Sequence, residues 1–253
     1  QRNNNSINNV AILVRAGFQT RTFEERFLKI GLPYQVVGGL RFYERAEIRD
    51  AIAYLRLVNS PDDQLAFERV INKPKRGLGE MTIRNIEQYS RASKLSLELA
   101  ARKLAETDEL SNKAASSIRL FAKNLDKWRI DVSKNKLGDL VEIILEESGY
   151  VEMLKKDRSI EAPGRLDNLK ELINAINEFD SLANFLEHIQ LVMDGSNNQN
   201  IETAKIMTLH AAKGLEFPLV FLPGWEEGLF PNQRSIDESG ESGLEEERRL
   251  AYV

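Results

Sequence analysis

Short runs of apolar and β-branched residues occur near both ends of the chain, and each has the length of a β-strand. Two of them, "VAILV" (residues 10–14) and "PYQVV" (residues 33–37), lie near the N-terminus. Two more, "AKIMTL" (residues 204–209) and "LVFL" (residues 219–222), lie near the C-terminus, and we expect the last one to be a buried strand. Two strands do not form a stable sheet alone. The pattern therefore predicts one α/β sheet assembled from both ends of the chain.

The segment between these strands has a helical period. Apolar residues recur at helical spacing from residue 65 to residue 193, and a separate helix is expected before them at residues 46–58. The polar stretch "DGSNNQN" (residues 194–200) has the composition of a linker. We therefore predict an α/β fold in which a discontinuous parallel-sheet domain carries an inserted all-α domain. The expected boundaries are 1–66 and 199–253 for the sheet domain and 67–198 for the insert.

Composition excludes several kinds of site. Hydrophobic residues make up 42% of the chain and charged residues 29%, which is ordinary for a soluble protein. The absence of cysteine excludes disulfides and cysteine-bound metals and suits a reducing compartment, so we expect a cytoplasmic protein without a membrane span. The net charge of -4 gives no overall attraction to nucleic acid, so such contacts need local basic patches. The acidic cluster at residues 237–247 has no histidine partners, so we expect a solvated linker that leads into a helix, and no metal site.

The stretch "IMTLHAAKGLEF" (residues 206–217) joins the last two expected strands. Ligands of parallel α/β sheets gather at the carboxyl ends of the strands, where Thr208 and His210 are expected to lie. Lys213 precedes a glycine, whereas the lysine of a P-loop follows its second glycine, so the stretch is not a P-loop. Lys213 can bind a phosphate, and Glu216 can accept a ribose hydroxyl. The alternative for each residue taken singly is a structural role in a turn.

A basic stretch, "KPKRGLGEMT" (residues 73–82), lies at the start of the helical segment. Backbone N–H groups at a glycine turn and at a helix N-terminus bind phosphate oxygens without reading sequence. We therefore expect a phosphate-contacting loop, and the alternative is a basic loop that merely begins a helix. The candidate residues are Lys73, Lys75, Arg76, Gly77, Gly79 and Thr82.

Several long stretches together resemble one family. "TLHAAKGLEFPLVFLPGWEEGLFP" is similar to motif V of the UvrD/PcrA/Rep group of superfamily 1 DNA helicases, and "LEEERRLAYV" to the start of their motif VI. "ILVRAGFQTRTFEERFLKIGLPYQVVGGLRFYERAEIRDAIAYLRL" resembles the segment with motifs IV and IVa, and "INKPKRGLGEMTI" the family's Gly-x-Gly element that contacts duplex DNA. The order is collinear over nearly the whole chain. The resemblance implies a second RecA-like domain that is interrupted by the all-helical domain called 2B.

The resemblance also implies roles for single residues. Carried over position by position, Glu216 would lie near the ribose of the nucleotide. The residues expected on the path to single-stranded DNA are Thr208, His210 and Lys213. In "GGLRFYERAEI", Arg41, Phe42 and Arg45 would face that strand, since an aromatic ring between two arginines suits base stacking with phosphate contact. The alternative places Phe42 and Tyr43 in the core, and the two arginines on a solvated face with Glu44 and Glu47.

The activity that the resemblance implies is ATP-dependent unwinding of DNA with 3′-to-5′ polarity, in DNA repair. The expected partners are single-stranded DNA, its junction with duplex DNA, the first RecA-like domain of the same protein, and repair proteins. The Walker A loop and motif II would lie upstream of Gln1, and the motif VI arginine after Val253. ATP and Mg2+ are therefore expected in the intact protein, and the chain alone is expected to be inactive and without a bound cofactor. Two alternatives remain: a regulatory or partner-binding helical module, or part of a helicase-nuclease subunit.

Overall fold

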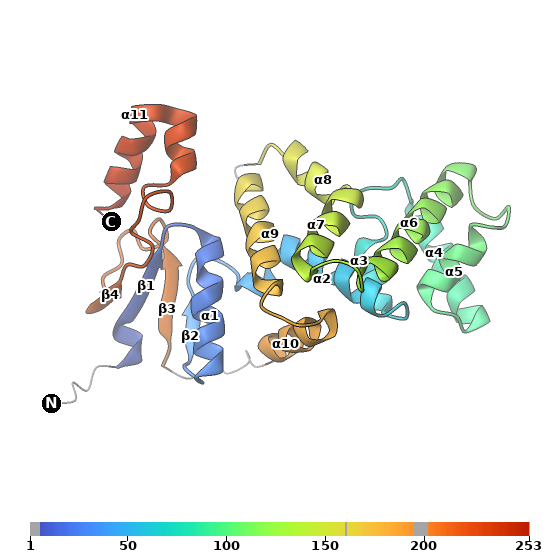
Figure 1. The fold of residues 1–253 in the computed structure, drawn as a ribbon, viewed down its shortest axis with the longest axis horizontal. Coiled ribbons are helices and arrows are strands. Elements are labelled where there is room, and N and C mark those ends of the chain that lie inside the picture. The colour runs from blue at the N-terminus through green and yellow to red at the C-terminus, as the bar shows by residue number, and fades with distance from the viewer. Residues whose placement is uncertain (1–5, 160, 195–201, 253) are drawn as a thin grey trace. The chain divides into compact units, whose positions relative to one another are not determined.

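The computed structural model describes residues 6–159, 161–194 and 202–252 (Figure 1). The chain divides into two compact units. The first unit consists of Gln1–Arg45 and Leu191–Val253, and the second of Ala46–Gln190. All but the first residue of the linker expected at residues 194–200 lies outside the described residues.

Four parallel strands form the sheet of the first unit, in the order β2-β3-β1-β4. Figure 1 shows the blue strands from the N-terminal segment beside the orange and red strands from the C-terminal segment, which confirms the predicted assembly from both ends. In the register, Ile12 lies opposite Ile206 on one side and Phe221 on the other. The strands are β1 Val10–Val14, β2 Tyr34–Val36, β3 Ala204–Thr208 and β4 Leu219–Phe221.

The central strand β1 is buried on both faces because all five of its residues are apolar, and in β3 the apolar residues Ala204, Ile206 and Met207 are buried, whereas Lys205 and Thr208 are half-buried. On one face, alternate residues of both strands pack with residues from the C-terminal segment. This cluster contains Ala11, Leu13, Met207, Leu209, Ala212, Phe230 and Leu250. Near the opposite sheet edge, the ring of Phe27 on helix α1 (Thr20–Lys29) lies 6.0 Å from the ring of Tyr34 on β2.

β4 is an edge strand, and the expectation that it is buried was wrong. Leu219, Val220 and Phe221 are 42%, 40% and 51% exposed. One side of β4 pairs with β1, and no strand in the described part of the chain pairs with its other side. The apolar sequence of β4 is therefore not sufficient to bury this strand against the described part of the chain.

A helix was expected to follow the acidic cluster at residues 237–247, but it already contains the whole cluster, so the linker part of that expectation was wrong. Helix α11 (Gln233–Leu250) begins before the cluster because the Asn232 side chain accepts the N–H groups of Arg234 and Ser235 at 3.1 and 3.3 Å. The helix is kinked at Gly240, where φ is 57° and ψ is -133°. Among the described residues, no group of three or more His, Asp or Glu side chains is placed to hold a metal ion.

The second unit is built from helices around an aromatic core. The rings of Phe121, Trp128 and Tyr150 lie 6.5, 6.0 and 6.4 Å from the ring of Tyr54. None of the described helices is long and apolar enough to cross a membrane. The helices are α2 Ala46–Asn59, α3 Gln64–Val70, α4 Glu80–Ser93, α5 Leu97–Leu104, α6 Asn112–Asp131, α7 Leu137–Glu147, α8 Tyr150–Lys156, α9 Ala162–Ile176 and α10 Leu182–Asp194, the last of which continues into the first unit.

Helices α2 and α3 pack with the helical unit, although the sequence assigned residues up to 66 to the sheet domain. Asn168 on α9 donates to the buried Glu47 carboxylate on α2 at 2.6 Å. The ring of Phe67 on α3 lies 6.3 Å from the ring of Phe121 on α6. These long-range contacts place the start of the compact unit at Ala46. The assignment of functional domains stays a prediction.

Candidate functional site

The carboxyl ends of the four parallel strands meet at one edge of the sheet. Pairing continues past the strand ends, because the N–H of Leu209 donates to Val14 O at 2.9 Å and the N–H of Val37 donates to Ile206 O at 2.9 Å. The stretch that follows β3 therefore begins at the edge where α/β sheets bind ligands. It is the first candidate surface, and it carries four of the residues singled out in the sequence.

This stretch folds into a compact turn. Thr208 Oγ1 accepts the N–H of Ala211 at 3.3 Å, and Thr208 O accepts the N–H of Ala212 at 3.1 Å. Gly38, after β2, approaches so closely that an added Cβ would lie 3.0 Å from the Cβ of Ala211. Its φ of 76° also favours glycine. Packing from β2 thus fixes the start of the turn.

Three of the four predicted residues in this stretch point their side chains to the surface. His210, Lys213 and Glu216 are exposed, whereas Thr208 is half-buried and its hydroxyl is used by the turn. Across the described ranges, no ion pair or side-chain hydrogen bond engages His210, Lys213 or Glu216. Their polar groups are therefore available to an anion, a sugar hydroxyl or a nucleic-acid backbone.

An ion pair at the same edge was missed by sequence reasoning. Arg15 directly follows β1, and its Nε and Nη2 donate to Glu247 Oε2 and Oε1 at 2.8 and 2.5 Å. The Glu247 side chain is 2% exposed and also accepts the N–H of Asn232 at 3.0 Å. Burial raises the pKa of this carboxyl, but the hydrogen bonds from Arg15 and Asn232 outweigh it and hold the pKa below its ordinary value of 4.5. An arginine directly after a buried strand was the signal that could have revealed this anchor.

The aromatic residue expected to stack on a base lies in the core of the first unit. Phe42 is 0% exposed and Tyr43 is 4% exposed. The two rings pack edge to face with their centroids 5.0 Å apart, and the N–H of Phe42 donates to the buried Glu24 carboxylate at 3.2 Å. Phe42 as it lies here cannot stack on a base, and the alternative place in the core is the one that the structure shows.

The two arginines beside Phe42 are half-buried. Arg45 Nη2 donates to Gly17 O at 3.0 Å and to Thr20 Oγ1 at 3.1 Å, which ties this segment to the start of α1. The guanidinium carbon of Arg41 lies 5.2 Å from the centroid of the Tyr34 ring. Both positive charges are thus partly held by contacts within the unit.

The second candidate surface is the loop between α3 and α4, whose cations differ in their partners. Lys73 Nζ lies 2.7 Å from Oδ2 of Asp50, a side chain that is 1% exposed. The same carboxylate pairs with Arg69 at 2.7 Å and accepts the Tyr150 hydroxyl at 2.7 Å. Lys75, in contrast, is exposed, and no ion pair within the described segments involves it. Its charge is available to an outside ligand.

Arg76 is the internal anchor of this loop. Its Nη1 donates to the carbonyl oxygens of Val70 and Ile71 at 2.7 and 3.1 Å, and its Nη2 donates to the Tyr54 hydroxyl at 2.6 Å. The guanidinium also lies over the Phe121 ring, with Cζ 4.6 Å from the centroid. The donors of Arg76 are therefore engaged inside the protein, although the sequence predicted a DNA contact.

Asn72, which sequence reasoning missed, shapes the turn. Its Oδ1 accepts the N–H of Arg76 at 2.8 Å, and its Nδ2 donates to Leu78 O at 2.7 Å. Gly79 then precedes α4, and no side chain caps this helix. The N–H groups of the first turn of α4, including that of Thr82, lack partners within the helix. The loop therefore leads directly into free backbone donors.

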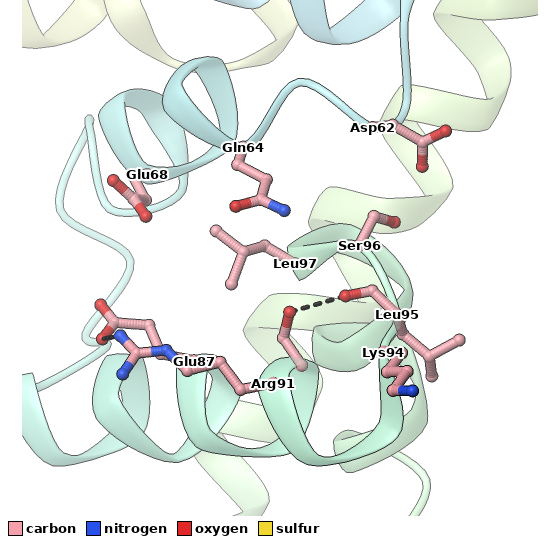
Figure 2. A pocket seen from close by; sticks show the side chains of 10 residues that line it. Asp62, Gln64, Glu68, Glu87, Arg91, Lys94, Leu95, Ser96 and Leu97 are labelled. Carbon is pink, nitrogen blue, oxygen red and sulfur yellow. Dashed lines mark hydrogen bonds and ion pairs between the residues drawn. The ribbon is translucent and has the colours of Figure 1, made fainter.

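A pocket of about 450 Å³ lies between α3, α4 and α5 (Figure 2). Its lining carries both signs of charge, with Asp62, Glu68 and Glu87 opposed by Arg91 and Lys94. Glu87 and Arg91 pair with each other at 3.5 Å. None of the predicted site residues lines this pocket, so it is separate from both candidate surfaces.

The amino-acid sequence of this chain is similar to those of known DNA helicases, over a region that includes both candidate surfaces. The model of the UvrD-like helicase C-terminal domain matches residues 1–253. A probable DNA helicase II homolog of Rickettsia felis is 49% identical over 250 residues, which cover 97% of this chain and 38% of that protein. DNA helicase II of Escherichia coli is 40% identical over 263 residues, which cover 100% of this chain and 36% of that protein. The ATP-dependent DNA helicase PcrA of Bacillus subtilis is 41% identical over 260 residues, or 98% of this chain and 35% of that protein.

The chain spans between 35% and 38% of the length of these three relatives. The matched region includes the sheet edge after β3 and the basic loop between α3 and α4. The family match and the sequence similarity both extend over the two units. The chain belongs to the UvrD-like helicase C-terminal domain family, with a RecA-like parallel sheet interrupted by helices.

Proposed function

We propose that this chain is the second motor-domain part of an ATP-dependent DNA helicase that moves along single-stranded DNA with 3′-to-5′ polarity and acts in DNA repair. The observation that supports this most strongly is the family match over residues 1–253. Two relatives that this chain matches over nearly its whole length are named DNA helicase II and ATP-dependent DNA helicase PcrA.

The sheet edge is the proposed contact with nucleotide and single-stranded DNA. Glu216 faces the nucleotide, and Thr208, His210 and Lys213 lie on the path to the DNA strand. The exposed, unpaired side chains of Lys213 and Glu216 in the described chain support these roles. ATP with Mg2+ supplies the free energy of the cycle in the intact protein. This surface would meet the first RecA-like domain and move the strand as the two domains close.

The basic loop is the proposed contact with duplex DNA at the junction. Lys75, Gly77, Gly79 and Thr82 supply a charge and backbone donors for phosphate oxygens. Lys73 and Arg76 stabilise the loop from inside the protein, because Lys73 pairs with Asp50 and Arg76 donates to carbonyl groups of the loop region. The partly exposed guanidinium groups of Arg41 and Arg45 are further proposed DNA contacts on the sheet unit.

The division into functional domains follows the same proposal. Residues 1–66 and 199–253 form the motor domain, and residues 67–198 form the helical insert. A DNA substrate is consistent with a cytoplasmic location and with repair proteins as further partners. A regulatory module or a helicase-nuclease subunit is not favoured, because the helicase family match runs through both units.

A strand-displacement assay with the full-length protein tests the proposed function. Duplexes with a single-stranded 3′ tail should be unwound with ATP, and duplexes with only a 5′ tail should not be. Lys213→Ala should lower unwinding and single-strand-stimulated ATP hydrolysis, whereas Lys205→Ala, which changes a lysine within β3 itself, should leave both near wild type. Unwinding that prefers the 5′ tail, or no ATP-dependent unwinding of either duplex, would contradict the proposal.

A further inference from the structure

A lysine distant in the sequence lies against the basic loop. Lys113 belongs to the first turn of α6. A Cβ added to Gly77 would lie 3.5 Å from Cε of Lys113 and 4.0 Å from its Nζ. Gly77 has a φ of 75°, so a glycine both allows this backbone conformation and leaves the space beside the ammonium open. The loop and this side chain thus border one small volume.

One face of α6 contacts the loop at Arg76. Residues four and eight positions after Lys113 share its face of the helix. The first, Ser117, donates its hydroxyl to Arg76 O at 3.0 Å. The second, Phe121, carries the ring under the Arg76 guanidinium, 4.6 Å from Cζ. Packing along this face therefore fixes the position of Lys113 relative to Gly77.

The charge of Lys113 is not explained by the stability of its own helix. The first turn of α6 contains no acidic residue. A positive charge there opposes the helix macrodipole, whose N-terminal end favours anions. Lys113 is exposed, and within the parts of the chain that the structure describes no ion pair involves it. Lys73 differs, since Asp50 pairs with it.

We infer that Lys113 contacts a phosphate of duplex DNA, together with Lys75 and the backbone of Gly77. The inference rests on the proposed function of the loop as a duplex contact. A phosphate group is negatively charged, so it can pair with the two ammonium groups and accept a hydrogen bond from the backbone N–H of Gly77. Such a contact reads no base sequence. The surface is then built by two segments, the loop after α3 and the first turn of α6.

The test measures binding of the full-length protein to a duplex with a single-stranded 3′ tail, by fluorescence anisotropy between about 50 and 200 mM salt. Lys113→Gln and Lys75→Gln should each weaken binding several-fold at low salt. Each should also reduce the slope of log affinity against log salt concentration by about 0.9, the value for one lost phosphate contact. The matched control is Lys123→Gln, an exposed lysine about 15 Å farther along α6, which should change neither quantity.

The variants separate the failure of this inference from the failure of the proposed function. If Lys75→Gln weakens binding and Lys113→Gln behaves like Lys123→Gln, the role of Lys113 is refuted and the loop remains a DNA contact. If neither variant weakens binding, the duplex-contact function of the loop is refuted as well. Lys113→Arg keeps the charge and should keep the wild-type slope. A loss equal to that of Lys113→Gln would show a packing defect and overturn the inference.

Discussion

The guanidinium of Arg76 holds the loop between α3 and α4 in shape, and replacing it by lysine tests whether this role is structural. Its five donor–acceptor contacts join three carbonyl groups of the loop region, the Tyr54 hydroxyl and Ser148 O. Arg76→Lys keeps the positive charge but replaces a planar fork by one ammonium group. The ammonium can retain some of these bonds but cannot span all the acceptors at once.

The expected loss of stability follows from the contacts that lysine cannot make. A hydrogen bond to a charged group contributes about 1.5–3 kcal/mol, and such contributions within one network do not add. The contact of the guanidinium with the Phe121 ring, with Cζ 4.6 Å from the centroid, is also changed. We therefore expect Arg76→Lys to lower the free energy of unfolding by about 2–4 kcal/mol. With a urea m-value of about 1–3 kcal/mol/M, the midpoint should fall by roughly 1 M or more.

The assay follows urea unfolding of the second unit by the fluorescence of Trp128, in a Trp225→Phe background that removes the other tryptophan of this chain. Arg84→Lys is the matched control, because the Arg84 side chain is 65% exposed and its pair with Glu80 is loose at 3.4 Å. The control should change stability by less than about 0.5 kcal/mol. A loss for Arg76→Lys no greater than that of the control, accompanied by weaker DNA binding, would refute the structural role.

Three further predictions concern the first unit. Glu247→Ala should cost about 2–4 kcal/mol at neutral pH by leaving Arg15 without its partner, somewhat less than for a fully buried pair. The folded-state pKa of Glu247 lies below its ordinary value of 4.5, so this stabilisation is present above pH 4.5 and is lost as the pH falls through the folded-state pKa. In urea titrations at acid pH, the free energy of unfolding of the variant should therefore approach that of the wild type. Gly38→Ala should cost about 1–2 kcal/mol in thermal unfolding, since φ is 76° and Ala211 is 3.0 Å from the added Cβ; a neutral result would contradict the tight packing. Phe42→Leu should lower stability by about 1 kcal/mol yet leave single-strand affinity within two-fold of wild type, and a large selective loss of affinity would return Phe42 to the DNA surface.

Local patterns in the sequence predicted much of the fold. The helical period at residues 46–58 corresponds to α2 at Ala46–Asn59, and the apolar runs correspond to the four parallel strands. These features depend on neighbouring residues, so periodicity reveals them. Burial of β4 failed as a prediction because burial depends on which strands flank it, and an apolar run carries no such information.

The site was harder to predict, because the charge of a residue does not show whether it contacts DNA or stabilises the loop from inside the protein. Arg76 and Lys75 are neighbours in one basic stretch, yet the first is engaged by the loop carbonyls and the second is exposed. Lys113 comes next to Gly77 only through the packing of α6, and Glu247 meets Arg15 across most of the chain. No local pattern encodes these distances, and only the tertiary structure shows them.

The central claim assigns the two surfaces to different parts of the DNA, and site-specific crosslinking of the full-length protein tests it most directly. This chain contains no cysteine, so Lys75→Cys and Lys213→Cys can each carry a photo-crosslinker once cysteines elsewhere in the protein are replaced. On a duplex with a 3′ single-stranded tail, the probe at position 75 should react with the duplex and the probe at position 213 with the tail. Reaction at the opposite parts, or no DNA adduct from either position, would contradict the account.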